Sequence, residues 1–305
     1  MLHEYAVEPE LVATWSERRS GRYFREKFGL GSPRIMSRYP PQNWERLVWE
    51  ARRDDSERKR MEELIRRLSE VMVTRHGAEW NPHESWLQNA LNEHRRIPFH
   101  AILVRSNGAS HRNVLVADEL DEHTSLWSVP HETIPRTAEA IAGTVRDLLR
   151  MAADIVFVDP HFAPQRSRYT RVLAACLTAS LDERLAREQP TVHIFTEADS
   201  KNGTRQYFEE HCRTRLPRML PRRQRVTISR LTERSEGEKL HNRYILTEFG
   251  GVGFPAGLDA KRGATDDPWL LTREQHRRRW PQYASRPLAF DQPEGEITVV
   301  GTSAL

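Results

Sequence analysis

The chain has 305 residues, of which 38% are hydrophobic and 30% charged, with a formal net charge of +4 and a pI of about 9.2. This length predicts two domains, and the apolar content excludes a chain that is disordered throughout. Most of the basic residues are Arg, whose planar guanidinium suits phosphate, so a polyanionic partner is one interpretation and a solvated surface the other.

The cysteines and the apolar runs indicate which metal sites, cellular location and membrane association to expect. Cys176 and Cys212 are isolated from each other and from any Cys or His pattern, so we expect no zinc site. No other pattern in the sequence points to a metal ion or a cofactor, and we expect neither. Two isolated thiols fit a reducing cytoplasm. No run approaches the roughly 18 apolar residues of a membrane span, and the first residues show no signal-peptide pattern. These features predict a cytoplasmic protein without a membrane partner.

The first part of the chain shows mostly helical spacing. Residues 1–40 have no clear periodicity, whereas apolar residues recur at helical intervals from Trp44 to about His76 and again over His83–Glu93. Two β-rich runs follow, at Phe99–Arg105 and Val114–Ala117. The sequence therefore predicts a mainly helical region over residues 1–135 with a short strand pair. No motif assigns a function to this region, which could serve substrate choice, protein partners or dimerisation.

Strands and helices alternate in the second part, residues 136–305. Short apolar, β-branched runs predict buried strands, and longer polar–apolar segments predict helices between them. The predicted strands are Asp154–Val158, Val192–Thr196, Val226–Leu231, Leu240–Leu246, Gly251–Phe254 and Glu296–Val300. The predicted helices are Thr137–Ala152, Arg168–Arg184, Gly203–Leu216 and Arg273–Trp280. This alternation predicts an α/β domain with a sheet flanked by helices.

One segment combines residues suited to phosphoryl transfer. His241 and Arg243 are two apart on a predicted strand, and period two places both side chains on one face. A turn at Gly250-Gly251 follows, so a hairpin could bring Glu248 or Asp259 close to His241. An imidazole can attack phosphorus, a guanidinium can hold phosphate oxygens, and a carboxylate can orient the imidazole.

Two further groups of residues suit ligand contact. Asp159 and His161 follow the first predicted strand of the second domain, at the end where open α/β sheets bind ligands. Arg277 and Arg278 lie in a basic run that ends at Trp280, a composition that suits phosphate contact and base stacking. For His161 the competing interpretation is a turn residue, and for the basic run it is a solvated helix face.

The His241 segment resembles the phospholipase D superfamily, whose members carry His-x-Lys, four residues and Asp, followed by a Gly-Ser-x-Asn-like end. Here the order is His241-x-Arg243, four residues, Glu248 and later Gly257-Leu258-Asp259. The run DIVFVDPHF resembles the first strand of the same fold, and the likeness covers about residues 140–260. The resemblance implies a phospholipase D-like mixed sheet in a single-motif member.

The resemblance also implies a metal-independent reaction in which one histidine attacks phosphorus and a second protonates the leaving oxygen. With one copy of the motif, the second histidine would come from a homodimer across a twofold axis. The implied roles are nucleophile or general acid for His241, phosphate clamp for Arg243 and orienter for Glu248. Asp159, His161, Asp259, Arg277 and Arg278 would contact the substrate.

Three functions remain open at this point. The first is a phosphodiesterase, with nucleic acid favoured as the substrate by the Arg-rich composition and a bacterial defence system as the setting implied by the family. The second is a degenerate module that binds nucleic acid or a protein partner, because Arg243 and Glu248 replace the family's Lys and Asp. The third is a scaffold that docks partner proteins through residues 1–135.

Overall fold

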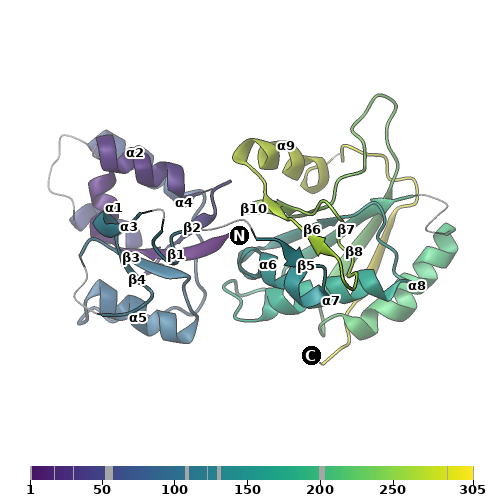
Figure 1. The fold of residues 1–305 in the computed structure, drawn as a ribbon, viewed down its shortest axis with the longest axis horizontal. Helices are drawn as coiled ribbons and strands as arrows, with labels where there is room; N and C mark the ends of the chain where they lie inside the picture. Colours follow the sequence, from purple (N-terminus) through teal and green to yellow (C-terminus); the bar gives the residue numbers. More distant parts are fainter. Residues whose placement is uncertain are drawn as a thin grey trace. The chain divides into compact units, whose positions relative to one another are not determined.

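The computed structural model describes residues 2–16, 18–29, 31–51, 58–106, 110–121, 123–128, 132–198, 203–286 and 288–304. The chain divides into two compact units, Leu2–Pro130 and His131–Leu305, which we treat separately and call the N-terminal and C-terminal units. Both are α/β structures (Figure 1). In the described ranges, no helix has the length and apolar character needed to cross a membrane.

The N-terminal unit contains a four-stranded parallel sheet, in the order β2-β1-β3-β4. Helical residues outnumber strand residues, as expected, but the expected short strand pair is wrong, because the unit has four strands in one sheet. The strands are β1 (His3–Val7), β2 (Arg34–Ser37), β3 (Ala101–Val104) and β4 (Val114–Val116). The sequence pattern does not predict β1 and β2, because they are only five and four residues long and lie within a stretch rich in Arg and aromatic residues.

Helices cover both faces of this sheet (Figure 1). The helices are α1 (Pro9–Ala13), α2 (Arg18–Lys27), α3 (Trp44–Glu50), α4 (Arg58–Ser69) and α5 (Trp86–Arg96). Tyr5 and Val7 of β1 pack with residues of α1 to α4, whereas Ala6 between them packs with Ala90 of α5. This alternation is the strand period of two with both faces buried. The predicted helix from Trp44 to His76 is α3 and α4, and its middle, 52–57, lies outside the described residues.

A buried ion cluster joins the sheet of the N-terminal unit to α5. The Arg75 side chain is wholly buried, and its Nε and Nη2 each lie 2.7 Å from a carboxylate oxygen of Glu4 on β1. Its Nη1 donates to Glu93 of α5 at 3.0 Å and to the carbonyl of Ile97 at 2.6 Å. One guanidinium therefore bonds two buried carboxylates, of which Glu93 also pairs with Arg96 at 2.7 Å.

The C-terminal unit is built on a seven-stranded mixed sheet, in the order β12-β10-β9-β6-β7-β8-β13. The strands are β6 (Asp154–Val158), β7 (Thr191–Glu197), β8 (Arg225–Leu231), β9 (Tyr244–Thr247), β10 (Gly250–Gly253), β12 (Trp269–Leu270) and β13 (Glu296–Val300). β6, β7 and β8 are parallel, while β9 runs antiparallel to β6 and β13 antiparallel to β8. A small separate sheet pairs β5 (Ile134–Pro135) with β11 (Thr265–Asp266).

Three helices, α6 (Ala138–Met151), α7 (Ser167–Leu181) and α8 (Arg205–Met219), lie on one face of this sheet, and α9 (Arg273–Ala284) lies on the other (Figure 1). Thr137, Thr204 and Thr272 each accept a backbone N–H bond at the start of a helix, which explains where α6, α8 and α9 begin. α8 continues to Met219 through Pro217, where we expected it to stop, because so late in a helix a missing N–H removes only one bond. The strand order brings the carboxyl end of β6 beside the amino end of β9.

Gly253 of β10 has no room for a side chain, because a Cβ there would lie 2.3 Å from the ring of Trp269 on β12. We expect Gly253→Ala to lower the free energy of unfolding by about 1–3 kcal/mol, the usual effect of overpacking. Gly143→Ala is the control, since Gly143 is an exposed residue of α6 with open space around its Cβ position. It should raise the stability by about 0.5–1 kcal/mol. Urea unfolding measures both, and an unchanged midpoint for Gly253→Ala would contradict the packing.

Candidate functional site

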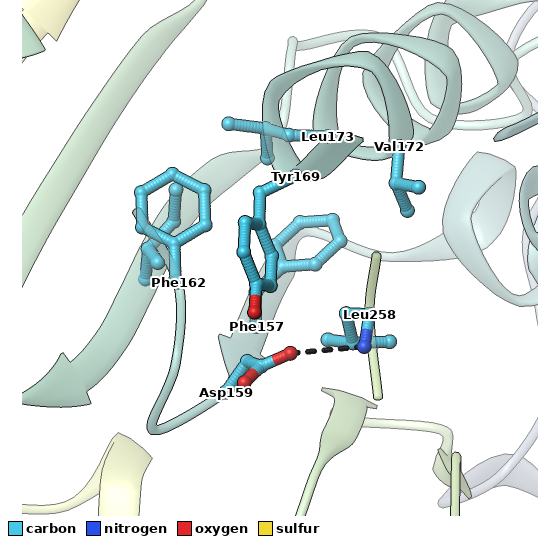
Figure 2. Close-up of a pocket in the computed structure, with 8 residues that line it drawn as sticks. Phe157, Asp159, Phe162, Tyr169, Val172, Leu173 and Leu258 are labelled. Carbon is cyan, nitrogen blue, oxygen red and sulfur yellow. Dashed lines mark hydrogen bonds between the residues drawn. The ribbon is translucent and has the colours of Figure 1, made fainter. Parts of the chain in front are cut away.

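The site lies at the carboxyl end of β6, where Asp159 follows the strand. Asp159 is 2% exposed. Its Oδ1 accepts the backbone N–H of His161 at 2.9 Å. Its Oδ2 accepts that of Leu258, also at 2.9 Å (Figure 2). Burial raises the pKa of Asp159, against the opposing effects of these N–H groups and of Arg243. The carboxylate thus joins the β6 end to the loop that follows β10.

Arg243 lies beside this carboxylate. β6 and β9 pair Val158 with Tyr244, so the next residues outward, Asp159 and Arg243, are neighbours across the two strands. The Arg243 side chain is half-buried, and in the described part of the chain it makes no hydrogen bond or ion pair. Its Nε is buried without a partner. A guanidinium without a hydrogen-bond partner beside a buried carboxylate is suited to accept an anion from outside the chain.

Asp259 occupies a second buried position in the same loop. It is 7% exposed and forms ion pairs with Arg136, which precedes α6, and with Nε of Arg168 in α7 at 3.3 Å. Gly257 makes this approach possible: its φ is +110°, and a Cβ there would lie 3.1 Å from Asp259 Oδ1 and 3.7 Å from Asp159 Oδ2. The Gly257–Asp259 loop therefore brings the two carboxylates together.

Arg168 and Tyr169 form the α7 side of the site. The Arg168 side chain is 46% exposed, so one edge of its guanidinium can meet a ligand while the other holds Asp259. The Tyr169 hydroxyl lies 3.4 Å from Arg168 Nη2 and points toward Asp159 (Figure 2). Burial raises the pKa of Tyr169, and the charges of Asp159 and Asp259 act in the same direction. The hydroxyl therefore stays protonated and able to donate.

A small apolar cavity lies under these polar groups, with room for about one water molecule. Asp159 and Tyr169 border it together with Phe157, Phe162 and Leu258 (Figure 2). It is too small for a base or an acyl chain, so an anionic ligand would have to bind outside it. The cavity lowers the polarity around Asp159, which agrees with the raised pKa of this carboxyl.

His241 is exposed and lies just before β9, not on a strand as we expected. The preceding segment is held by Glu233, whose carboxylate accepts the N–H of Leu240 at 2.9 Å and pairs with Lys239 at 2.6 Å. These contacts replace strand pairing and explain why β9 begins only at Tyr244. Both ring nitrogens of His241 lack a hydrogen-bond partner in the described ranges, so they are open to a ligand.

Glu248 does not lie near His241, and the expected role as its orienter is wrong. It follows β9, at the other end of the strand, where its carboxylate accepts the N–H groups of Ala153 at 2.6 Å and Asp154 at 3.3 Å. The antiparallel pairing of β9 with β6 puts the residue after β9 beside the start of β6, away from the end that carries Asp159. Glu248 therefore anchors the amino end of β6.

Glu248→Ala tests this assignment. The variant leaves two N–H groups without their acceptor, so we expect it to lower the free energy of unfolding by about 1–2 kcal/mol. Binding of a labelled oligonucleotide should change less than about twofold. Thermal unfolding and fluorescence anisotropy measure the two effects. A large loss of oligonucleotide affinity in a stably folded variant would contradict this and show that Glu248 takes part in ligand binding.

In the basic run of α9, two arginines form ion pairs within the unit and one is exposed to solvent. Arg278 and Arg279 both pair with Glu238, Arg279 at 3.0 Å, and Arg279 also lies over the ring of Tyr244. Arg277 is exposed, and no contact of its side chain is seen in the described segments. Arg278 and Arg279 thus fix α9 to the loop before His241, and Arg277 alone is open to a ligand.

The structure brings together Asp159, Asp259 and Arg243 from the predicted set, and adds Arg136, Arg168 and Tyr169, which sequence analysis missed. Arg136 and Arg168 lie among many arginines and carry no motif, so only the two ion pairs with Asp259 single them out. Within the described residues, no group of three or more His, Cys, Asp or Glu side chains is arranged to hold a metal ion.

Comparison with protein-family models, with curated proteins and with solved structures gives no significant match to this chain.

Proposed function

We propose that the C-terminal unit binds a phosphodiester at the carboxyl end of β6 and hydrolyses it through His241. The observation that carries the proposal is the half-buried Arg243 guanidinium, which has no partner in the described chain and lies beside the buried Asp159. A non-bridging phosphate oxygen would complete its hydrogen bonds. The exposed imidazole of His241, two residues earlier, would then be the group that attacks phosphorus.

Nucleic acid is the ligand class that we favour. The exposed edge of Arg168 and the exposed Arg277 would add contacts to neighbouring phosphates, and the chain as a whole is basic. The cavity beside Asp159 is too small for an acyl chain, which argues against a lipid held by its tail. Hydrolysis by histidine needs no metal, so activity should persist in EDTA.

The second candidate is a module that binds nucleic acid or a protein partner without cleaving it. Its specific support is that the carboxylate expected to orient His241 lies at the far end of β9 and bonds to Ala153 and Asp154 instead. An imidazole that is not held in one tautomer by a neighbouring group is a weaker nucleophile. In this case Arg243 would still hold phosphate.

Arg243→Ala tests the shared part of both candidates. We expect the affinity for a labelled single-stranded DNA to fall about 10- to 100-fold, the usual effect of losing a charged hydrogen bond. The slope of log K against log salt should fall by about one. Arg213→Ala is the matched control, since Arg213 is an exposed α8 residue paired with Glu209. An unchanged DNA affinity of Arg243→Ala would show that Arg243 does not hold phosphate and would contradict both candidates.

A further inference from the structure

We infer that the ring of Tyr207 stacks on an unpaired base of the nucleic acid whose phosphate binds at Arg243, so that the site takes a single strand rather than a duplex. The inference rests on the phosphate site proposed above and names the form of nucleic acid that this site binds. Tyr207 lies in the first turn of α8 and is 44% exposed. In the described part of the C-terminal unit, every other Tyr, Trp and Phe side chain is buried or half-buried.

The contacts of Tyr207 hold its ring in place and leave part of it open. Gly203 lies against the ring, because its φ is +85° and a Cβ there would lie 2.6 Å from Cδ1 of Tyr207. The backbone N–H of Tyr207 donates to the Thr204 hydroxyl at 3.3 Å. The ring of His211, one turn later, is tilted by 52° against that of Tyr207, so it does not stack flat on it. A ring that is held before binding loses little conformational entropy when a base stacks on it.

The loop that follows Asp159 leads from the phosphate site toward α8. Its Pro160 carbonyl accepts the hydroxyl of Thr196 at 3.0 Å, which fixes the loop on the carboxyl end of β7. Further along the same loop, the carbonyl of Gln165 accepts a bond from Arg215 of α8 at 2.8 Å. α8 itself follows β7 and lies on the same face of the sheet as α7 (Figure 1). The phosphate site and the start of α8 are therefore at one edge of the sheet, with this loop between them.

A short piece of nucleic acid spans this edge. In the sheet order β9-β6-β7, the strand that follows Arg243 and the strand that precedes α8 are two positions apart. At the usual spacing of strands in a sheet, their ends are about 10 Å apart. Stacked nucleotides advance about 3.4 Å each. A few nucleotides therefore reach from a phosphate at Arg243 to a base at the start of α8.

The surface along this path is basic. Arg166, Arg168 and Arg171 are exposed at the start of α7, a helix that contains no Asp or Glu. Arg215 of α8 and His161 of the loop are exposed as well. Positive charge along the path suits the phosphates, and an exposed aromatic ring beside it suits a base. The bases of a duplex are already paired and stacked on one another, so only an unpaired base can lie on the ring.

The test compares wild type, Tyr207→Ala and Tyr207→Phe by fluorescence anisotropy with three labelled probes: an oligothymidylate, an oligonucleotide of stable abasic units and a DNA duplex. Tyr207→Ala should lower the affinity for oligothymidylate about 5- to 100-fold, the usual effect of losing one base–aromatic stack. The slope of log K against log salt should not change, because no charge is lost. Tyr207→Phe should bind as wild type, since the ring makes the contact. All three proteins should bind the abasic probe within about twofold of one another, and wild type should bind the duplex more weakly than oligothymidylate.

Tyr23→Ala is the matched control, because Tyr23 is 41% exposed and lies on α2 of the N-terminal unit; it should bind as wild type. The unfolding midpoint of Tyr207→Ala should match that of wild type, which excludes a folding defect. Equal affinities of wild type and Tyr207→Ala for oligothymidylate, or a wild type that prefers the duplex, would overturn the inference. A loss of affinity in Arg243→Ala would in that case leave the phosphate site standing. If Arg243→Ala also binds as wild type, the proposed function is overturned as well.

Discussion

His241→Ala is expected to lower the rate of phosphodiester cleavage at least about 10³-fold, the effect of removing the attacking group itself. His241 is exposed on the chain surface and bonds to no described neighbour, so its replacement leaves the fold and the Arg243 contact in place. The affinity for the oligonucleotide should therefore change less than about threefold. Cleavage of single- and double-stranded DNA and RNA in EDTA, beside anisotropy for binding, separates the two effects.

Two controls sharpen this result. His211→Ala removes another histidine of the same unit and should keep full activity. The unfolding midpoint of His241→Ala should match that of wild type, which excludes a folding defect. Cleavage by His241→Ala at the wild-type rate would contradict the assignment of the nucleophile, whatever else binds the substrate.

The second large effect concerns the N-terminal unit. Arg75→Met is expected to lower its free energy of unfolding by about 3–5 kcal/mol, because the buried Glu4 carboxylate loses its bidentate guanidinium and Glu93 keeps only its pair with Arg96 on the same helix. Burial acts to lower the pKa of Arg75, and the two carboxylates outweigh it, so the pKa is raised and the residue stays charged. Arg75 also lies 3.5 Å from the ring centroid of Phe99, a contact that methionine can partly replace.

Tryptophan fluorescence during urea unfolding measures this effect, because six of the eight Trp residues belong to the N-terminal unit. The matched control is Arg66→Met. Arg66 pairs with Glu63 and Glu70 on the exposed face of α4, where each pair contributes only a few tenths of a kcal/mol. Equal effects of the two substitutions would show that the buried cluster does not stabilise the unit.

Sequence analysis predicted the C-terminal sheet well where the strands are buried on both faces. Asp154–Val158 coincides with β6, and the predicted strands at Val192 and Val226 fall within β7 and β8. Such runs are short, continuous, apolar and β-branched, which favours a strand buried on both faces over a helix. The short strands β1 and β2 give no such signal, since HEYAV and RIMS are brief and mix polar with apolar residues.

From the sequence, a residue of the site could be placed only where it directly follows a recognisable strand. Asp159 follows a recognisable strand, whereas Arg243 reaches it through the pairing of β9 with β6, which the sequence does not reveal. Glu248 was misplaced because spacing along a motif says nothing about which end of a strand a residue reaches. Arg136 and Arg168 could not be found, because they come from distant segments that meet only through Asp259.

The proposed hydrolysis requires that His241 form a covalent bond to phosphorus. The most direct measurement is to incubate wild-type protein with thymidine 5′-(p-nitrophenyl phosphate) in EDTA, quench it at alkaline pH and map the adduct by mass spectrometry. We expect thymidylate on the tryptic peptide Leu240–Arg243, at His241, and none on His241→Ala. Release of nitrophenolate without an adduct at His241, or with the adduct on another residue, would contradict it.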